Sequence, residues 1–174
     1  MTLNDPLPLK KHGGRNDLVG EHPQGDSLQV VIILVFLAVW ITDTFIWQYS
    51  TFLTGYVPVY ARLVAGTAVA VPALILIYRA HKMIFGTERA EPVVLRTGVF
   101  SVVRHPLYLG SILSVLSMVL YSLSLASAGI WIVIVVFYAY ICRYEEKALL
   151  LHFGEEYRQY QEEVPMLLPW IGTR

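Results

Sequence analysis

The segment from residue 92 to 110, PVVLRTGVFSVVRHPLYLG, holds the side chains of this sequence best suited to binding a ligand. Pro106 suits the first position of a helix, where the missing N–H costs no hydrogen bond. Arg104, His105 and Tyr108 therefore gather at a helix N-terminus, which favours a carboxylate or phosphate. An alternative needs no ligand: Arg and His end a membrane span, and Tyr anchors it at the interface.

A second cluster of charged residues follows the last long apolar run. Glu145 and Glu146 stand directly after this run, and Arg143 lies two residues before Glu145. If the run folds as a helical hairpin, its two polar ends are neighbours, and these residues meet the first cluster. The alternative is a solvated acidic segment. The expected proximity of the two clusters is the strongest indication of a functional site that the residues give by themselves.

The length of the apolar run favours a hairpin. Residues 107–141 are too many for one crossing, which needs about 20 residues. They suffice for two short spans, about 107–121 and 127–142, with a turn in SLSLASAG at 122–129. The alternative is one long span followed by a re-entrant tail.

Two further apolar runs precede the hairpin, at about 28–49 and 57–78, and each is long enough to cross a bilayer. Asp43 lies near the end of the first run and Arg62 near the start of the second, so the two charges should reach similar depth. An unpaired charge at that depth is costly, and we expect the two side chains to pair. Separate extension of each to the interface is the alternative.

The remaining segments are polar. Residues 1–27 are rich in Pro and Gly without apolar periodicity, which predicts a disordered tail. Residues 79–106 connect the second and third spans, and 143–163 are expected to form an amphipathic helix whose Tyr157 and Tyr160 pack on the membrane surface. The predicted fold is an all-α integral membrane protein with about four transmembrane helices in a domain comprising residues 28–174.

Composition agrees with this fold and excludes other classes. The chain has 174 residues, of which 56% are hydrophobic and 15% are charged, against about 25% charged in soluble proteins. Thirteen basic and thirteen acidic residues give no net charge, so the chain lacks the basic field of a nucleic-acid-binding protein. The single cysteine, Cys142, excludes an intrachain disulfide, and no metal site is expected.

The basic residues predict the orientation in the membrane. Twelve of the thirteen fall on one side of a four-span arrangement, and Arg62 is the exception. By the positive-inside rule, both termini and the 79–106 segment face the cytoplasm. We expect a multi-pass protein of a bacterial inner membrane; the oligomeric state stays open.

An ordered set of motifs resembles a known group of enzymes. TGVFSVVRHPLYLG at 97–110, the pair at 145–146, FGEEYRQY at 153–160 and the final VP…LP follow one another as in the isoprenylcysteine carboxyl methyltransferase and phospholipid methyltransferase family. The resemblance covers about residues 92–170. Phe100 stands where this family usually has Tyr.

The resemblance implies methyl transfer from S-adenosylmethionine at the cytoplasmic membrane surface. The acceptor would be lipophilic, or a small thiol or carboxylate, with isoprenylcysteine carboxyl O-methylation as the nearest analogy. Arg143 would orient an anionic substrate group. The implied cofactor-binding residues are Pro92, Val93, Val94, Leu95, Phe100, Arg104, His105, Pro106, Leu107, Tyr108, Glu145 and Glu146.

Two other functions compete with this one. Membrane sterol or enone reductases that use NADPH carry a similar turn before a hairpin, but with Asn where this chain has Leu107. They also have an Arg-Asp pair where this chain has Glu145 and Glu146. The other alternative is a non-catalytic membrane module on the same scaffold.

Overall fold

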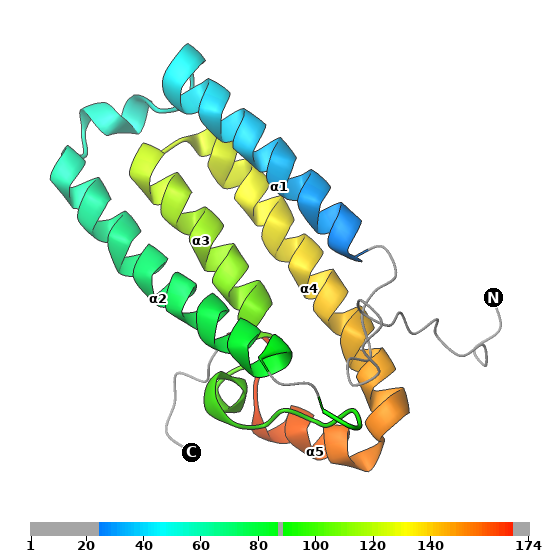
Figure 1. Cartoon of the computed structure of the whole chain (residues 1–174). Helices are drawn as coiled ribbons and strands as arrows, with labels where there is room; N and C mark the ends of the chain where they lie inside the picture. Colours follow the sequence, from blue (N-terminus) through cyan, green and yellow to red (C-terminus); the bar gives the residue numbers. More distant parts are fainter. Residues whose placement is uncertain (1–24, 87–88, 169–174) are drawn as a thin grey trace.

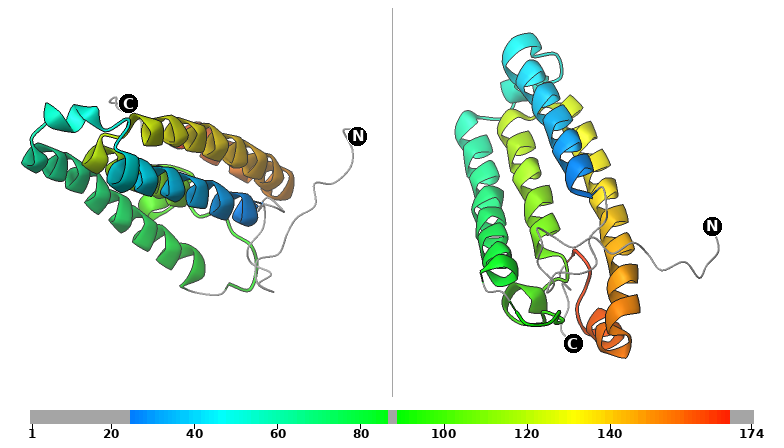
Figure 2. Two further views of the ribbon diagram at one scale, coloured as in Figure 1. Left: turned by 90° about the horizontal axis from the view of Figure 1, so that it is seen from above. Right: turned by 45° about the vertical axis from the view of Figure 1, so that its right-hand side comes forward.

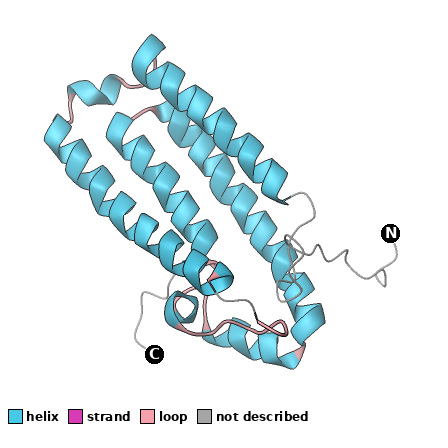
Figure 3. Ribbon diagram, in the orientation of Figure 1, coloured by secondary structure: helices cyan, strands magenta, loops and turns pink. Residues whose placement is uncertain are grey.

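The described part of the chain is helical. A computed structural model describes residues 25–86 and 89–168, and no strand occurs within these two ranges (Figure 3). The predicted all-α class is confirmed. In chain order the elements are α1 (Gly25–Ile41), the π-helix η1 (Thr42–Trp47), the 3-10 helix η2 (Phe52–Gly55), α2 (Val59–Phe85), the 3-10 helix η3 (Gly98–Ser101), α3 (Pro106–Ser122), α4 (Leu125–Phe153) and α5 (Glu155–Glu163).

The four long helices lie side by side as a bundle, with α5 at one end (Figures 1 and 2). Three helical segments are long and apolar enough to cross a membrane: Ser27–Trp47, Val59–Phe85 and Leu125–Phe153. The fourth helix, α3, is also apolar but has only 17 residues. Large apolar side chains such as Val64 and Val136 face outward, 68% and 64% exposed. An apolar exterior of this kind is suited to lipid, so the chain is a multi-pass membrane protein.

The expected hairpin is formed by α3 and α4. Pro106 occupies the start of α3, and the turn takes only Leu123 and Ser124, the first of which has a positive φ of 50°. The Ser124 side chain caps α4 by accepting a hydrogen bond from the Ser127 N–H at 3.0 Å. One long span is therefore wrong for residues 107–141, and the polar ends of both helices lie at the same end of the bundle (Figure 1).

Packing within the bundle holds these ends in place. The core joins α1, α3 and α4 through Phe36, Ile112, Val115, Val119, Ile134 and Tyr138. The most extensive interhelical contact is between α2 and α3. There Gly110 approaches α2 so closely that an added Cβ would lie 3.1 Å from the Ala73 carbonyl oxygen. Close contact with α2 thus fixes the first turns of α3.

The predicted ion pair between Asp43 and Arg62 is wrong. The Asp43 carboxylate accepts hydrogen bonds from the Ser50 N–H (3.0 Å) and from the Ser50 and Ser124 hydroxyls (2.5 Å each). Arg62 instead donates from Nη1 to the Tyr121 carbonyl at 2.9 Å. Each charge is bound by neutral groups because the tight turns bring serines and a carbonyl nearer than the opposite charge.

Two of the expected boundaries differ in the structure. The predicted helix from 143 to 163 is two helices, because α4 ends at Phe153 and Gly154 has a φ of 59° and ψ of −127°, a conformation that only glycine adopts without strain. Of the predicted disordered tail, residues 1–24 lie outside the described residues, while 25–27 already belong to α1.

Candidate active site

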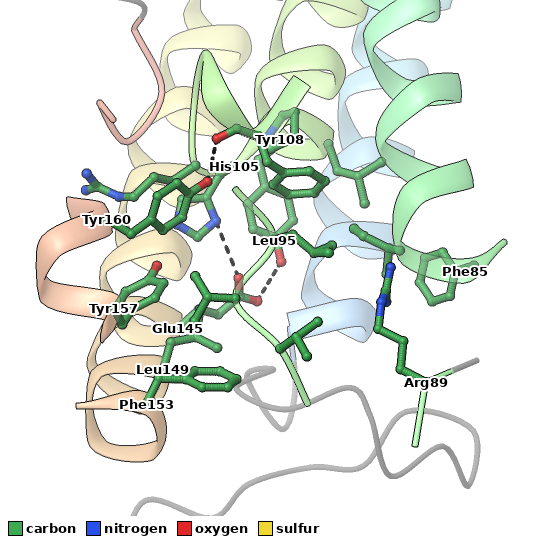
Figure 4. A pocket seen from close by; sticks show the side chains of 17 residues that line it. Phe85, Arg89, Leu95, His105, Tyr108, Glu145, Leu149, Phe153, Tyr157 and Tyr160 are labelled. Atoms are coloured by element: carbon green, nitrogen blue, oxygen red, sulfur yellow. Dashed lines mark hydrogen bonds and ion pairs between the residues drawn. The ribbon is translucent and has the colours of Figure 1, made fainter. Parts of the chain in front are cut away.

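A pocket lies at the end of the bundle where α3 begins, between the ends of α2 and α4, the loop before η3, and α5 (Figure 4). Its volume is about 220 Å³. Polar groups from α3 and α4 form one part of the wall, and the rest is mainly apolar. The lining residues are Ile84, Phe85, Arg89, Val93, Val94, Leu95, Phe100, Arg104, His105, Pro106, Leu107, Tyr108, Glu145, Leu149, Phe153, Tyr157 and Tyr160.

The polar wall connects the two predicted clusters directly. Tyr108 donates a hydrogen bond from its hydroxyl to Glu145 Oε1 at 2.6 Å. His105 is 8% exposed, with Nδ1 3.8 Å from Glu145 Oε2, and its ring stacks on Tyr108 at 5.8 Å between centroids. The start of α3 and the C-terminal third of α4 therefore share one network, as the predicted hairpin requires.

Beneath this wall, Glu146 is buried and its carboxylate accepts hydrogen bonds from several side chains. Arg104 Nε lies 2.6 Å from Glu146 Oε1, and the side chains of this ion pair are 9% and 11% exposed. His105 Nε2 lies 3.2 Å from the same oxygen, and Gln161 Nε2 donates to Oε2 at 3.1 Å. Glu146 thus ties the residues before α3 to both α4 and α5, which is a positioning role, and it does not line the pocket.

The segment after α5 returns to the same place. The backbone N–H groups of Arg104 and His105 donate to the carbonyls of Pro165 (2.9 Å) and Met166 (3.1 Å). The Arg104 guanidinium also donates to the carbonyls of Gln161 and Val164. These two N–H groups, which precede the first turn of α3, are consequently not available to an anionic ligand.

Helix α5 closes one side of the pocket. Tyr157 and Tyr160 are each 3% exposed and pack with Val164, Val94 and Phe153. The Tyr160 hydroxyl donates to the Phe100 carbonyl at 2.6 Å. Burial raises the pKa of both tyrosines above the ordinary value of 10.0, so both stay neutral. Their predicted packing on the membrane surface is wrong, because both are buried against the segment that leads into α3, which includes Val94 and Phe100.

Most of the predicted ligand-binding residues lie in this pocket, and three do not. The exceptions are Pro92, whose neighbours line the pocket, Glu146, which lies beneath it, and Arg143, which is exposed on α4. The structure does not bring Arg143 to the pocket because it lies two residues before Glu145, and a helix turns by about 200° over two residues.

Seven lining residues were not predicted as ligand contacts: Ile84, Phe85, Arg89, Leu149, Phe153, Tyr157 and Tyr160. Leu149 and Phe153 follow Glu145 at intervals of four residues, so they share its face of α4. That spacing was visible in the sequence. No spacing rule points to Phe85 and Arg89, because their distance from α3 depends on the loop between them.

The pocket offers one carboxylate, a histidine, tyrosine hydroxyls and arginines beside a broad apolar surface. No group of three or more potential metal-ligating side chains occurs among residues 25–86 and 89–168. The arrangement suits an organic ligand that carries charged and hydroxyl groups at one end and a flat or apolar part at the other. Fold and site together define a multi-pass membrane protein with a small-molecule pocket at one end of its helices.

Comparison with known proteins places the chain in a family. The phospholipid methyltransferase family matches residues 61–156, which run from the start of α2 to the start of α5, and the chain belongs to this family. The match includes most of the pocket, although it ends before Tyr157 and Tyr160. No solved structure matches the chain significantly.

Two curated relatives are methyltransferases. Methanethiol S-methyltransferase 1 of Bradyrhizobium diazoefficiens is 30% identical over 97 residues, 54% of this chain and 32% of the relative. Methanethiol S-methyltransferase of Crocosphaera subtropica is 28% identical over 145 residues, 74% of this chain and 52% of the relative. The chain therefore spans about a third and about half of the lengths of these relatives.

Proposed function

We propose that this protein transfers a methyl group from S-adenosylmethionine to a small thiol or a lipophilic acceptor at the cytoplasmic membrane surface. The observation that carries the proposal is the pocket in which Tyr108, His105 and Glu145 form a polar wall opposite apolar side chains. Family membership supports the reaction class.

The side chains of the pocket fit the groups of S-adenosylmethionine. Glu145 offers carboxylate oxygens to the ammonium or ribose hydroxyls, and Arg89 offers a cation to the carboxylate. Val94, Leu95 and Phe100 form an apolar surface for the adenine ring. When bound, the cofactor supplies a methyl group on a positively charged sulfur.

The protein's own contribution would be alignment and exclusion of water. Methyl transfer is an in-line displacement, so its rate depends on holding the two reactants in register. Two interactions keep the polar wall rigid. They are the Arg104–Glu146 ion pair and the hydrogen bond from Tyr160 to the Phe100 carbonyl. A thiolate or carboxylate acceptor needs no strong base at the site, because it is already a nucleophile.

The names of the relatives and the walls of the pocket support the proposed class of acceptor. Both curated relatives are named for methanethiol, a small apolar thiol. Apolar side chains such as Phe85, Leu149 and Phe153 line the pocket and would accept such a molecule or the end of a lipid. A small thiol is the first acceptor to test, and a prenylated cysteine carboxylate is the second.

Ligand-induced stabilisation distinguishes this function from its rivals. The protein purified in detergent is titrated with S-adenosylhomocysteine and, separately, with NADPH while its melting temperature is followed. A ligand that binds only the folded state must raise this temperature. We expect a rise with S-adenosylhomocysteine alone. A rise with NADPH alone would identify a reductase, and no rise with either would indicate a non-catalytic module.

Acceptor identity is tested by transfer of an isotopically labelled methyl group. Protein reconstituted in vesicles receives labelled S-adenosylmethionine together with a small alkyl thiol, a prenylated cysteine or phospholipid alone. We expect label in the small thiol. Label in the prenylated cysteine or in the phospholipid would keep the reaction class and replace the acceptor.

A further inference from the structure

A second cavity lies at the opposite end of the bundle, far from the pocket described above. It has a volume of about 350 Å³ and lies between η1, the loop that follows it, the start of α2 and the end of α3. Both polar and apolar side chains line it. The lining residues are Trp40, Thr44, Phe45, Gln48, Thr51, Thr54, Arg62, Tyr121 and Ser122.

Two hydrogen-bond donors in this cavity have no partner among the residues that the structure describes. Arg62 Nε and the Thr44 hydroxyl are both buried and make no hydrogen bond. Buried polar groups are normally satisfied by a hydrogen-bond partner, and an unsatisfied one destabilises the fold. The Arg62 guanidinium is held in place, because Nη1 donates to the Tyr121 carbonyl at 2.9 Å. An acceptor that enters the cavity would satisfy both donors once the side chains that cover them move aside.

The cavity carries one positive charge and no negative charge among its lining residues. The nearest acidic residue along η1, Asp43, is 5% exposed, and its carboxylate is bound by Ser50 and Ser124. No described carboxylate oxygen lies within 4.0 Å of Arg62, since the ion pairs of the described residues involve other cations. An anion would complete the site electrostatically.

Aromatic side chains around this end of the bundle indicate its depth in the membrane. Trp47, Tyr49, Tyr56 and Tyr60 are 73%, 89%, 83% and 69% exposed. Exposed Trp and Tyr gather at the level of lipid headgroups. Arg62 lies close to Tyr60 in the first turn of α2, so the cavity lies at the depth of lipid phosphates.

We propose that this cavity binds the phosphate group of an anionic ligand, with Arg62 and Thr44 as donors. Arginine binds phosphate through a planar set of N–H groups, and a threonine hydroxyl adds a neutral donor beside it. The phosphate has two sources, a phospholipid headgroup or free phosphate in solution. Headgroup depth and the apolar Trp40 and Phe45 beside the donors favour the lipid.

The test uses the full chain in a maltoside detergent that contains no phosphate. Its probes are inorganic phosphate and short-chain phosphatidic acid, with binding followed by melting temperature and by native mass spectrometry. The test variants are Thr44→Val and Arg62→Gln. Thr42→Val is the matched control on the same π-helix, because the Thr42 hydroxyl donates to the Ala38 carbonyl, and Arg158→Gln is the control for charge.

We expect phosphatidic acid to bind the wild type and both controls, and to bind each test variant about tenfold more weakly. Binding of inorganic phosphate with the same dependence on Arg62 and Thr44 would support the site and identify free phosphate as a source. If neither probe binds, or if both bind the test variants as tightly as the wild type, the proposal is wrong. Thr44→Val keeps all charges, so it tests the site even if Arg62→Gln fails to fold.

Discussion

Glu145 and Glu146 are adjacent in the sequence but have different surroundings. Successive helical residues point about 100° apart, so Glu145 faces the pocket while Glu146 points to the junction of α4, α5 and the loop before α3. The Glu145 carboxylate lines the pocket, and the Glu146 carboxylate holds together the parts that form it. Substitutions at the two positions should therefore fail in different ways.

Glu146→Gln should mainly reduce stability. It leaves the guanidinium of Arg104, 9% exposed, without its carboxylate, and loss of one member of a buried ion pair costs about 3 kcal/mol. The melting temperature in detergent measures this loss. The control is Glu155→Gln, whose pair with Arg158 involves side chains 70% and 61% exposed and should be worth less than about 0.5 kcal/mol. Equal melting temperatures for the two variants would contradict the positioning role.

Tyr108→Phe should weaken cofactor binding without unfolding the protein. The change removes the 2.6 Å hydrogen bond to Glu145 Oε1, which is one of the contacts that hold this carboxylate at the pocket wall. A carboxylate with fewer contacts must be ordered when the ligand binds, so we expect about a tenfold loss of affinity for S-adenosylhomocysteine.

The control for this substitution is Tyr140→Phe, because Tyr140 lies on the same helix as Glu145 but is 61% exposed. Its affinity should equal that of the wild type. Unchanged affinity in Tyr108→Phe, measured by calorimetry, would show that Glu145 is held by other contacts.

The break between α4 and α5 determines where Tyr157 and Tyr160 lie beside the pocket. Gly154 has a φ of 59°, and an added Cβ there would meet no atom within 4 Å. Gly154→Ala should therefore cost about 1–3 kcal/mol through backbone strain alone. The control is Gly129→Ala, also in open space but in ordinary helical conformation, which should leave stability unchanged or raise it. A difference in melting temperature measures the strain, and equal values would exclude it.

Sequence patterns predicted those elements that follow from length and periodicity. The apolar run of about 35 residues and Pro106 predicted the hairpin, and the hairpin placed Glu145 beside Tyr108. A single glycine within a helical pattern is usually tolerated, so the break at Gly154 was not predicted. The predicted pairing of Asp43 with Arg62 was wrong because the Ser50 and Ser124 hydroxyls bind the Asp43 carboxylate. Turns bring these serines to the carboxylate, and no rule based on sequence spacing describes the geometry of such turns.

For the whole molecule, the two ends of the bundle differ in chemistry. One end holds the pocket with Glu145, and the other holds the cavity with Arg62. Between them the helices expose apolar side chains that suit a bilayer. In the proposed orientation the pocket lies on the cytoplasmic side of the membrane, and the cavity lies at the opposite headgroup layer.

A cysteine-accessibility measurement tests this orientation. A single reporter cysteine introduced as Arg158→Cys, in the Cys142→Ala background, should react with a membrane-impermeant maleimide only after cells are opened. A cysteine at Tyr56, 83% exposed at the other end, is the matched control and should react in intact cells. The reverse labelling pattern would show that the protein has the opposite orientation, with the pocket outside the cytoplasm.

Equilibrium binding of labelled S-adenosylmethionine tests most directly whether the pocket beside Glu145 binds this cofactor. We expect saturable binding of one molecule per chain by the wild type and by Glu155→Ala, whose side chain is exposed on α5. We expect loss of that binding in Glu145→Ala, which should melt at a lower temperature because Tyr108 loses its acceptor but should still unfold in one cooperative transition. No saturable binding to the wild type, or equal binding by a folded Glu145→Ala variant, would contradict the proposed cofactor site.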